Sequence, residues 1–221
     1  TTEILQPHAD ALGGTAILDL SSGGAAEAEE LVDMLEATGA GWLIGMINAY
    51  PSGIGAAETS ILCASPEPVW SEHGEAIRVL GGASAHVGTT AAAIPALFAS
   101  LFTARQGFMF GLIYGGAICR RAGLPVEAFA AQIPVTLGMA AKYGETFART
   151  VPDKAYDDPG ATMADYLHAL DDVMARFEAT GTADAFPRLM RDLTRQAVEA
   201  GLSDKELTAL VEMLANDGDD A

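Results

Sequence analysis

Few side chains in this sequence have the types and spacing that metal-ion or nucleophilic catalysis requires. The four histidines are scattered, and none forms a convincing metal-binding pair with a carboxylate at helical spacing, so no metal site is predicted. There is no GxSxG turn, no Walker-type phosphate loop and no GxGxxG after a strand. The remaining candidate is SSGG at 21–24, where backbone N–H groups could approach a cofactor. An ordinary strand-to-helix turn needs the same residues.

These candidates must be positioned by an α/β part followed by helices. Over residues 1–88, short apolar runs and amphipathic periodicity indicate alternating strands and helices. The expected strands are 15–20, 41–50, 59–65 and 85–87, and the expected helices are 25–38 and 70–80. The rest of the chain predicts helices only, at 126–150, 162–180, 183–200 and 203–214. Ser203, with Glu206 three residues later, has the pattern of a capping box that opens the last helix.

A long apolar helix is expected between these two parts, from Thr90 to Ala122. Arg105 and Gln106 interrupt it near the centre, where a charge costs about 2.5 to 3.5 kcal/mol in a bilayer. The run is also rich in Ala and Gly rather than Leu and Ile. We therefore expect protein, and not membrane lipid, to cover this helix.

Composition and charge narrow the possible partners and location. The chain of 221 residues carries a net charge of −18, which disfavours nucleic acid because that partner needs clustered Lys and Arg. Cys63 and Cys119 lie in apolar runs, as free thiols do in a reducing cytoplasm. The first ten residues have neither the basic nor the apolar region of a secretory signal, so a cytoplasmic location is predicted. The absence of an initiator Met is consistent with a start inside a longer protein.

The order of the segments is more specific than any single motif. Along the chain come LSSG, GMINAYPSGIG, ETSILCAS, LGGASAHVG, the apolar helix, RAGLPVEAF and PRLMRDLTRQAVEAGLSDKELTALVEML. Together they resemble the imine reductases, which are NADPH-dependent relatives of the β-hydroxyacid and 6-phosphogluconate dehydrogenases. The resemblance covers nearly the whole chain.

The resemblance implies a fold and an assembly. Residues 1–88 would be the C-terminal part of a nucleotide-binding Rossmann domain, 89–122 a long interdomain helix, and 123–221 a helical domain for dimerisation and substrate binding. The fold class is thus an incomplete Rossmann α/β part followed by an all-α part. Two subunits would exchange helical domains in a homodimer, so that the partner chain covers the apolar helix.

This sequence departs from the family pattern in two ways. The family's Gly-rich fingerprint would lie before residue 1, with about 80 residues missing, or half a nucleotide domain of ordinary size. The family's usual proton donor is an Asp or Tyr early in the interdomain helix, and an ungapped count from Gly88 places Phe98 there. Phenylalanine cannot donate a proton, so the proton would come from another group or from water.

The remaining site residues are carried over from the same resemblance. The predicted cofactor contacts, on the nicotinamide side of NADPH, are Ser21, Ser22 and Gly23. The predicted substrate contacts are Gln106, Met139, Tyr143, Asn48 and Tyr50. Tyr114 and Tyr143 are candidate stand-in proton donors, although core packing is the favoured reading of both, as it is of Met139.

The implied activity is NADPH-dependent reduction of an imine to an amine. A mainly apolar pocket favours a hydrophobic cyclic imine or a ketone over a phosphorylated sugar. The alternative is a non-redox dimeric scaffold or binding module that has lost the cofactor site and the proton donor.

Overall fold

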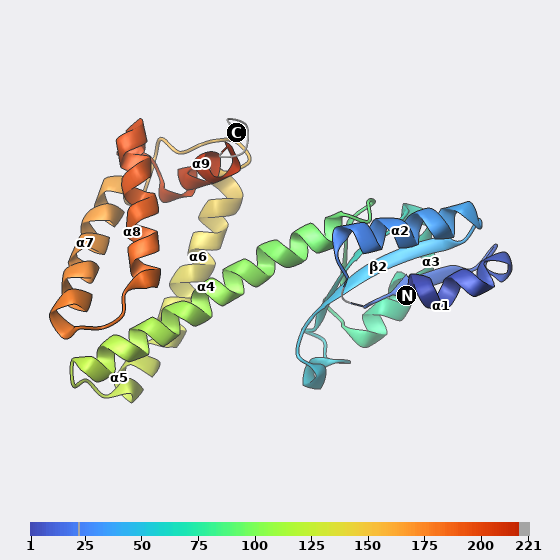
Figure 1. Ribbon diagram of the computed structural model, residues 1–221, viewed down its shortest axis with the longest axis horizontal. Coiled ribbons are helices and arrows are strands. Elements are labelled where there is room, and N and C mark those ends of the chain that lie inside the picture. The colour runs from blue at the N-terminus through green and yellow to red at the C-terminus, as the bar shows by residue number, and fades with distance from the viewer. Residues whose placement is uncertain (22, 217–221) are drawn as a thin grey trace. The chain divides into compact units, whose positions relative to one another are not determined.

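The computed structural model describes residues 1–21 and 23–216, so the predicted cofactor contact Ser22 lies outside the described residues. The chain divides into two compact units, Thr1–Gln106 and Gly107–Ala221 (Figure 1). The first unit contains the sheet and the second is helical, which confirms the predicted fold class.

The first unit is built on a four-stranded mixed sheet in the order β1-β2-β3-β4. Its strands are β1 (Ala16–Asp19), β2 (Gly41–Asn48), β3 (Ser60–Ala64) and β4 (Ala85–Gly88). The pairs β1·β2 and β3·β4 are parallel, and β2·β3 is antiparallel. Among the described residues, β1 pairs only with β2, so its other side is an edge of the sheet.

Alternation along β2 explains how helices cover both faces of this sheet. Trp42 and Ile44 point to one face, where they pack with Leu35 of α2 (Ala25–Ala37). Leu43 points to the other face and packs with Ile77 of α3 (Glu67–Leu80). The unit also has the short helices α1 (Thr2–Leu5), η1 (Gln6–Ala11) and η2 (Pro51–Gly53).

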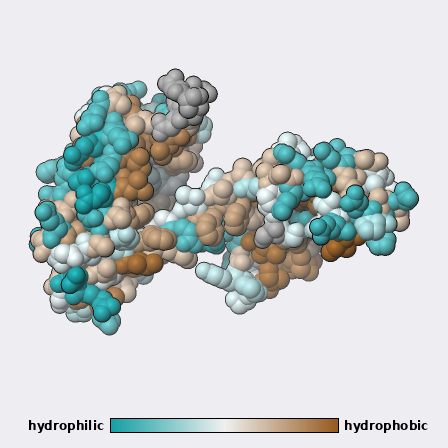
Figure 2. Space-filling model, viewed as in Figure 1, coloured by the Kyte–Doolittle hydropathy of each residue, from teal (hydrophilic) through white to brown (hydrophobic). Residues whose placement is uncertain are grey.

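The long helix α4 (Ala93–Arg121) begins in the first unit and continues into the second. Ile94 is its one buried residue, and the apolar side chains of Phe98, Phe110 and Ile113 are 45%, 49% and 64% exposed. Figure 2 shows mostly apolar colours along its visible surface. An 18-residue window of α4 has a mean hydropathy of 1.3, so the helix is long and apolar enough to cross a membrane. That protein and not lipid covers α4 therefore stays a prediction.

The second half of α4 also contains four glycines. A Cβ atom at Gly115 would lie 2.6 Å from the ring of Phe129 in α5 (Val126–Ala130), so this close approach requires glycine. Gly107, Gly111 and Gly116 have no such neighbour within 4 Å.

Further helical elements follow α5 in the second unit. They are α6 (Ile133–Thr150), α7 (Met163–Thr180), α8 (Ala185–Ala197), the π-helical turn η3 (Val198–Leu202), η4 (Leu207–Ala209) and α9 (Leu210–Asn216). Tyr156, Met163, Ala197 and Ala209 form the buried core of this unit.

Three helices expected from the sequence are wrong in their bounds. The expected helix 126–150 breaks before α6, because Pro134 has no N–H and its ring would clash with the carbonyl of residue 130. The expected helix 183–200 ends as α8 at Ala197, followed by Gly201 at φ +91°. Ser203 and Glu206 form no capping box, since Glu206 itself caps η4 by accepting the Leu207 N–H at 3.0 Å.

Candidate functional site

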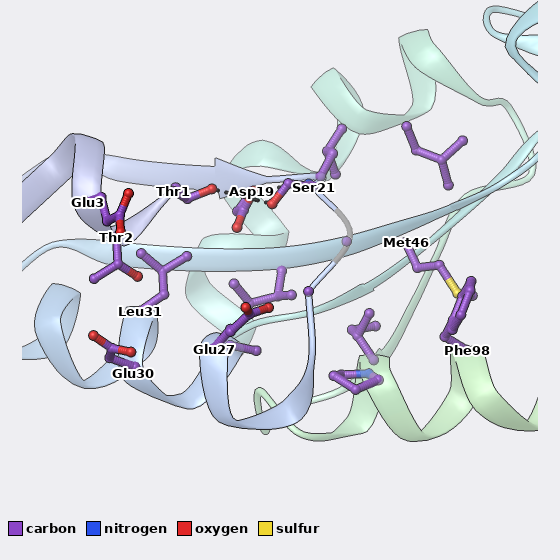
Figure 3. A pocket seen from close by; sticks show the side chains of 18 of the residues that line it. Thr1, Thr2, Glu3, Asp19, Ser21, Glu27, Glu30, Leu31, Met46 and Phe98 are labelled. Carbon is purple, nitrogen blue, oxygen red and sulfur yellow. Dashed lines mark hydrogen bonds between the residues drawn. The ribbon is translucent and has the colours of Figure 1, made fainter.

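A cavity of about 610 Å³ opens in the first unit beside the carboxyl end of β1 (Figure 3). Residues of α1, the β1–α2 turn, α2, β2 and the first turns of α4 line it. Ligands of α/β sheets bind beyond the carboxyl ends of parallel strands, and β1 and β2 are such a pair. The cavity is therefore the candidate site.

The side of the cavity at the end of β1 is polar. The Asp19 carboxylate accepts a hydrogen bond from the Ser21 N–H at 3.0 Å, and the Ser21 hydroxyl lies 3.3 Å from that of Thr1. Glu27 reaches back and accepts the Gly24 N–H at 2.9 Å, which closes the first turn of α2 where Gly24 offers no side chain. Glu27 thus fixes Gly24 at the start of α2.

The other side of the cavity is apolar and comes from β2 and α4. Met46, Ile94, Pro95 and Phe98 line it, and Figure 3 shows Phe98 beside Met46. The Phe98 ring stacks on Phe102 with ring centroids 5.4 Å apart. This side can hold an apolar substrate and keep water away, but it offers no proton.

The polar side fits one end of a nicotinamide cofactor. Ser21 supplies a hydroxyl, and Gly23 supplies exposed backbone with no side chain of its own, which suits a flat ring with an amide group. The described lining includes the carboxylates of Glu3, Asp19, Glu27 and Glu30 but no Lys, Arg or His, so it does not suit phosphate groups.

Three of the predicted site residues meet at this cavity, namely Ser21, Gly23 and Phe98. Asn48, Tyr50 and Gln106 belong to the same unit but do not line the cavity. Asn48 and Tyr50 are exposed, and Gln106 is half-buried.

The other predicted site residues belong to the second unit. The Tyr114 ring packs at a tilt against Phe177 and Phe186, with centroid distances of 6.3 and 5.7 Å. Burial, followed by the charges of Glu206 and Tyr166, raises the pKa of Tyr143. Met139 is 69% exposed.

Sequence reasoning missed Asp19 and Met46. Asp19 is the last residue of β1, directly before the SSGG turn, and that position at a strand end was a usable signal. Met46 precedes the predicted contact Asn48 by two residues in β2, so both point to the same face.

Comparison with known proteins decides the family. Residues 88–216 match the family described as "NADPH-dependent reductive aminase-like, C-terminal domain". The chain belongs to this reductive aminase-like family. The resemblance to imine reductases expected from the ordered segments is thereby confirmed.

Individual relatives agree with the family match. An NADPH-dependent reductive aminase from Aspergillus oryzae is 22% identical over 213 residues, which cover 95% of this chain and 72% of the relative. The structure of an imine reductase from Myxococcus stipitatus in complex with NADP+ matches with a TM-score of 0.87 and 25% identity, over 96% of this reductive aminase-like chain and 78% of that one. A reductive aminase from Aspergillus terreus in complex with NADPH and ethyl-5-oxohexanoate matches with a TM-score of 0.79 and 25% identity. The match covers 91% of this chain and 70% of that one.

Proposed function

We propose that the protein is an NADPH-dependent oxidoreductase that reduces C=N bonds to amines, on hydrophobic cyclic imines or imines formed from ketones. The observation that carries this proposal is the family match over residues 88–216. The apolar side of the cavity around Met46 and Phe98 supports a hydrophobic substrate. We place the enzyme in the cytoplasm, as its two free cysteines suggest.

In this proposal each side of the cavity has its own task. NADPH, when bound, supplies the hydride. Ser21 and Gly23 hold the amide-bearing ring at the end of β1, while Met46 and Phe98 contact the apolar part of the substrate and exclude water. Phe98 positions the substrate but cannot protonate it.

We further propose a homodimer in which the subunits exchange helices. Residues 89–122 would connect the nucleotide-binding part at 1–88 to the dimerisation and substrate-binding part at 123–221. Two features support this assembly: the exposed apolar face of α4, and an apolar groove of about 380 Å³ between α7 and α8 of the second unit. Leu170, Val173 and Met190 are among the residues that line this α7/α8 groove. The α4 helix of a second copy would occupy it.

Cofactor oxidation tests the redox proposal. The purified full-length gene product, mixed with NADPH and 2-methyl-1-pyrroline or 3,4-dihydroisoquinoline, should lose absorbance at 340 nm and form the corresponding amine. A protein that binds no NADPH and oxidises none with a panel of cyclic imines would contradict the proposal.

A second candidate function is a non-redox dimeric scaffold, which Phe98 at the proton-donor position favours. Measurement of NADPH fluorescence on titration with protein separates the two functions. A scaffold that has lost the cofactor site leaves the fluorescence unchanged, whereas a reductase enhances it at micromolar protein.

A further inference from the structure

Phe98 leaves the proposed reduction without a group that accommodates positive charge on the substrate nitrogen. An imine accepts hydride at carbon most readily when its nitrogen is protonated, so the site needs a partner for an N–H that carries positive charge. The apolar side of the cavity offers none. A partner must therefore come from the polar side.

Asp19 is placed to be that partner. It ends β1, at the carboxyl end of the parallel pair β1·β2, and its side chain lines the same cavity as Phe98. In Figure 3, Asp19 and Ser21 lie on one side of the cavity, and Met46 and Phe98 lie on another. A substrate that spans the cavity would contact both sides.

The other carboxylates of the cavity are less suited to this role. Glu27 is engaged in closing the first turn of α2 through Gly24. Glu3 and Glu30 are exposed, so water and salt screen their charges, whereas Asp19 is half-buried. The hydrogen bond from the Ser21 N–H uses one Asp19 oxygen and fixes the orientation of the carboxylate, which leaves the other oxygen for a ligand.

We propose that Asp19 is a catalytic carboxylate that accepts a hydrogen bond from the protonated imine nitrogen and so takes over the charge-handling role that Phe98 cannot perform. The inference rests on the proposed function and adds a residue to it. Asp19 stabilises the cation through charge and geometry and neither gives nor takes a proton in the step.

The step balances with solvent as the proton source. The imine nitrogen takes one proton from water before reduction, and Asp19 holds that N–H. The carbon of the C=N bond gains the hydride that NADPH supplies, the π electron pair passes to nitrogen, and a neutral C–N amine and NADP+ result. Asp19 ends the step as it began.

The test starts with Asp19→Asn, which keeps an oxygen to accept the Ser21 N–H and removes the charge. With 3,4-dihydroisoquinoline, kcat/KM should fall about 10- to 100-fold, as expected for the loss of a hydrogen bond to a charged group. The loss should be larger at pH 9 than at pH 6. Without the negative charge of Asp19, the bound imine keeps its proton only at the lower pH. Asp19→Glu should restore part of the rate and the wild-type pH profile.

Two controls separate this role from a general effect of charge or packing. The side chains of Glu3, Glu27 and Glu30 are the other ionisable ones among the described residues of the cavity. Glu29→Gln removes the same charge from an exposed position of α2 outside the cavity lining and should leave the pH profile unchanged. Phe98→Asp, added to Asp19→Asn, should recover rate by supplying a carboxylate from the opposite side.

Binding of a stable cation tests the role without turnover. In the presence of NADP+, calorimetry should show that Asp19→Asn weakens binding of piperidine, which is protonated at neutral pH, by about 10-fold. Binding of neutral cyclohexanol should be unaffected. If the wild-type protein reduces imines and Asp19→Asn keeps its rate, its pH profile and its piperidine affinity, the role of Asp19 is disproved and the proposed function stands. If the wild-type protein reduces no imine, the proposed function fails, and equal piperidine affinity of both proteins would refute the role of Asp19 as well.

Discussion

Phe98 and Phe102 lie one turn apart in α4 and stack on each other, yet they have different surroundings. Their side chains are exposed to similar extents, 45% and 40%, but only Phe98 lines the cavity. They form a matched pair that separates the effect of a carboxylate in the site from that of a carboxylate on α4.

We predict that Phe98→Asp changes kcat or its pH dependence in imine reduction, because the new carboxylate lies at the cavity. Steady-state rates from pH 6 to pH 9 would reveal this. Phe102→Asp should change stability alone. Equal effects of both substitutions on stability, with no effect on rate, would mean that Phe98 only packs.

Cys63 should be chemically inert in the folded protein. It is fully buried in β3, and burial raises the pKa of its thiol from 9.0 to about 11. We expect the Cys119→Ser variant, which leaves Cys63 as the one thiol, to resist iodoacetamide at pH 8 until it is denatured, as judged by mass spectrometry. Rapid labelling of the native variant would show that β3 opens.

The same burial makes stability depend on pH. The pKa of Cys63 is higher in the folded than in the unfolded chain. The contribution of the buried neutral thiol to the free energy of unfolding is therefore fully present below pH 9 and is lost as the pH rises toward 11. Cys63→Ser should remove this part of the alkaline loss of stability.

At the residue scale, the sequence identified only part of the site. The ordered segments led to Ser21, Gly23 and Phe98, which line one cavity. The position of Asp19 at a strand end was a signal in the sequence, but Met46 could not be ranked above its neighbours, because its importance depends on which strand ends and helix turns meet in space. Hydrophobic periodicity predicts each helix or strand separately, and it does not predict which of them lie side by side.

Strands and helices were predicted well where their pattern is strong. All four expected strands are present, because apolar runs between turn residues are typical of a buried sheet. The errors lie at helix ends in the second unit, where single residues decide. Pro134 divides one expected helix, and Glu206 caps η4 instead of completing a capping box with Ser203.

A real capping box opens α7 and gives a prediction at this scale. Thr162 accepts the Asp165 N–H at 3.2 Å, and Asp165 accepts the Thr162 N–H at 2.8 Å. Thr162→Ala should lower the free energy of unfolding by about 1 kcal/mol in urea denaturation. Thr136→Ala on the exposed face of α6 should be neutral or slightly stabilising, since alanine is the better helix former. Equal losses in both variants would contradict the role of the cap.

The cap should also respond to acid. Hydrogen bonds from Thr162 lower the pKa of the Asp165 carboxyl. Its contribution is therefore present above the usual pKa of Asp and is lost as the pH falls through the lowered value, so wild type and Thr162→Ala should converge in acid.

For the whole molecule, the proposed homodimer depends on the α7/α8 groove. Val173→Asp places a charge in the groove, where a partner's apolar helix would have to desolvate it. We expect this variant to shift from dimer to monomer in light scattering coupled to size-exclusion chromatography. Val79→Asp is the control, because Val79 is 76% exposed on α3, far from that groove in the sequence and in the other unit. A monomeric wild-type protein, or a dimer in both variants, would contradict the proposed assembly.

The glycines of α4 connect assembly with folding. Each costs a helix about 1 kcal/mol relative to alanine, and only Gly115 is required by a neighbour within the chain. A helix with four such residues and one buried side chain gains little from its own subunit. If a second copy of the chain covers the exposed apolar face of α4, folding becomes a bimolecular equilibrium governed by mass action. The melting temperature should then rise with protein concentration, so that dilution alone weakens the fold.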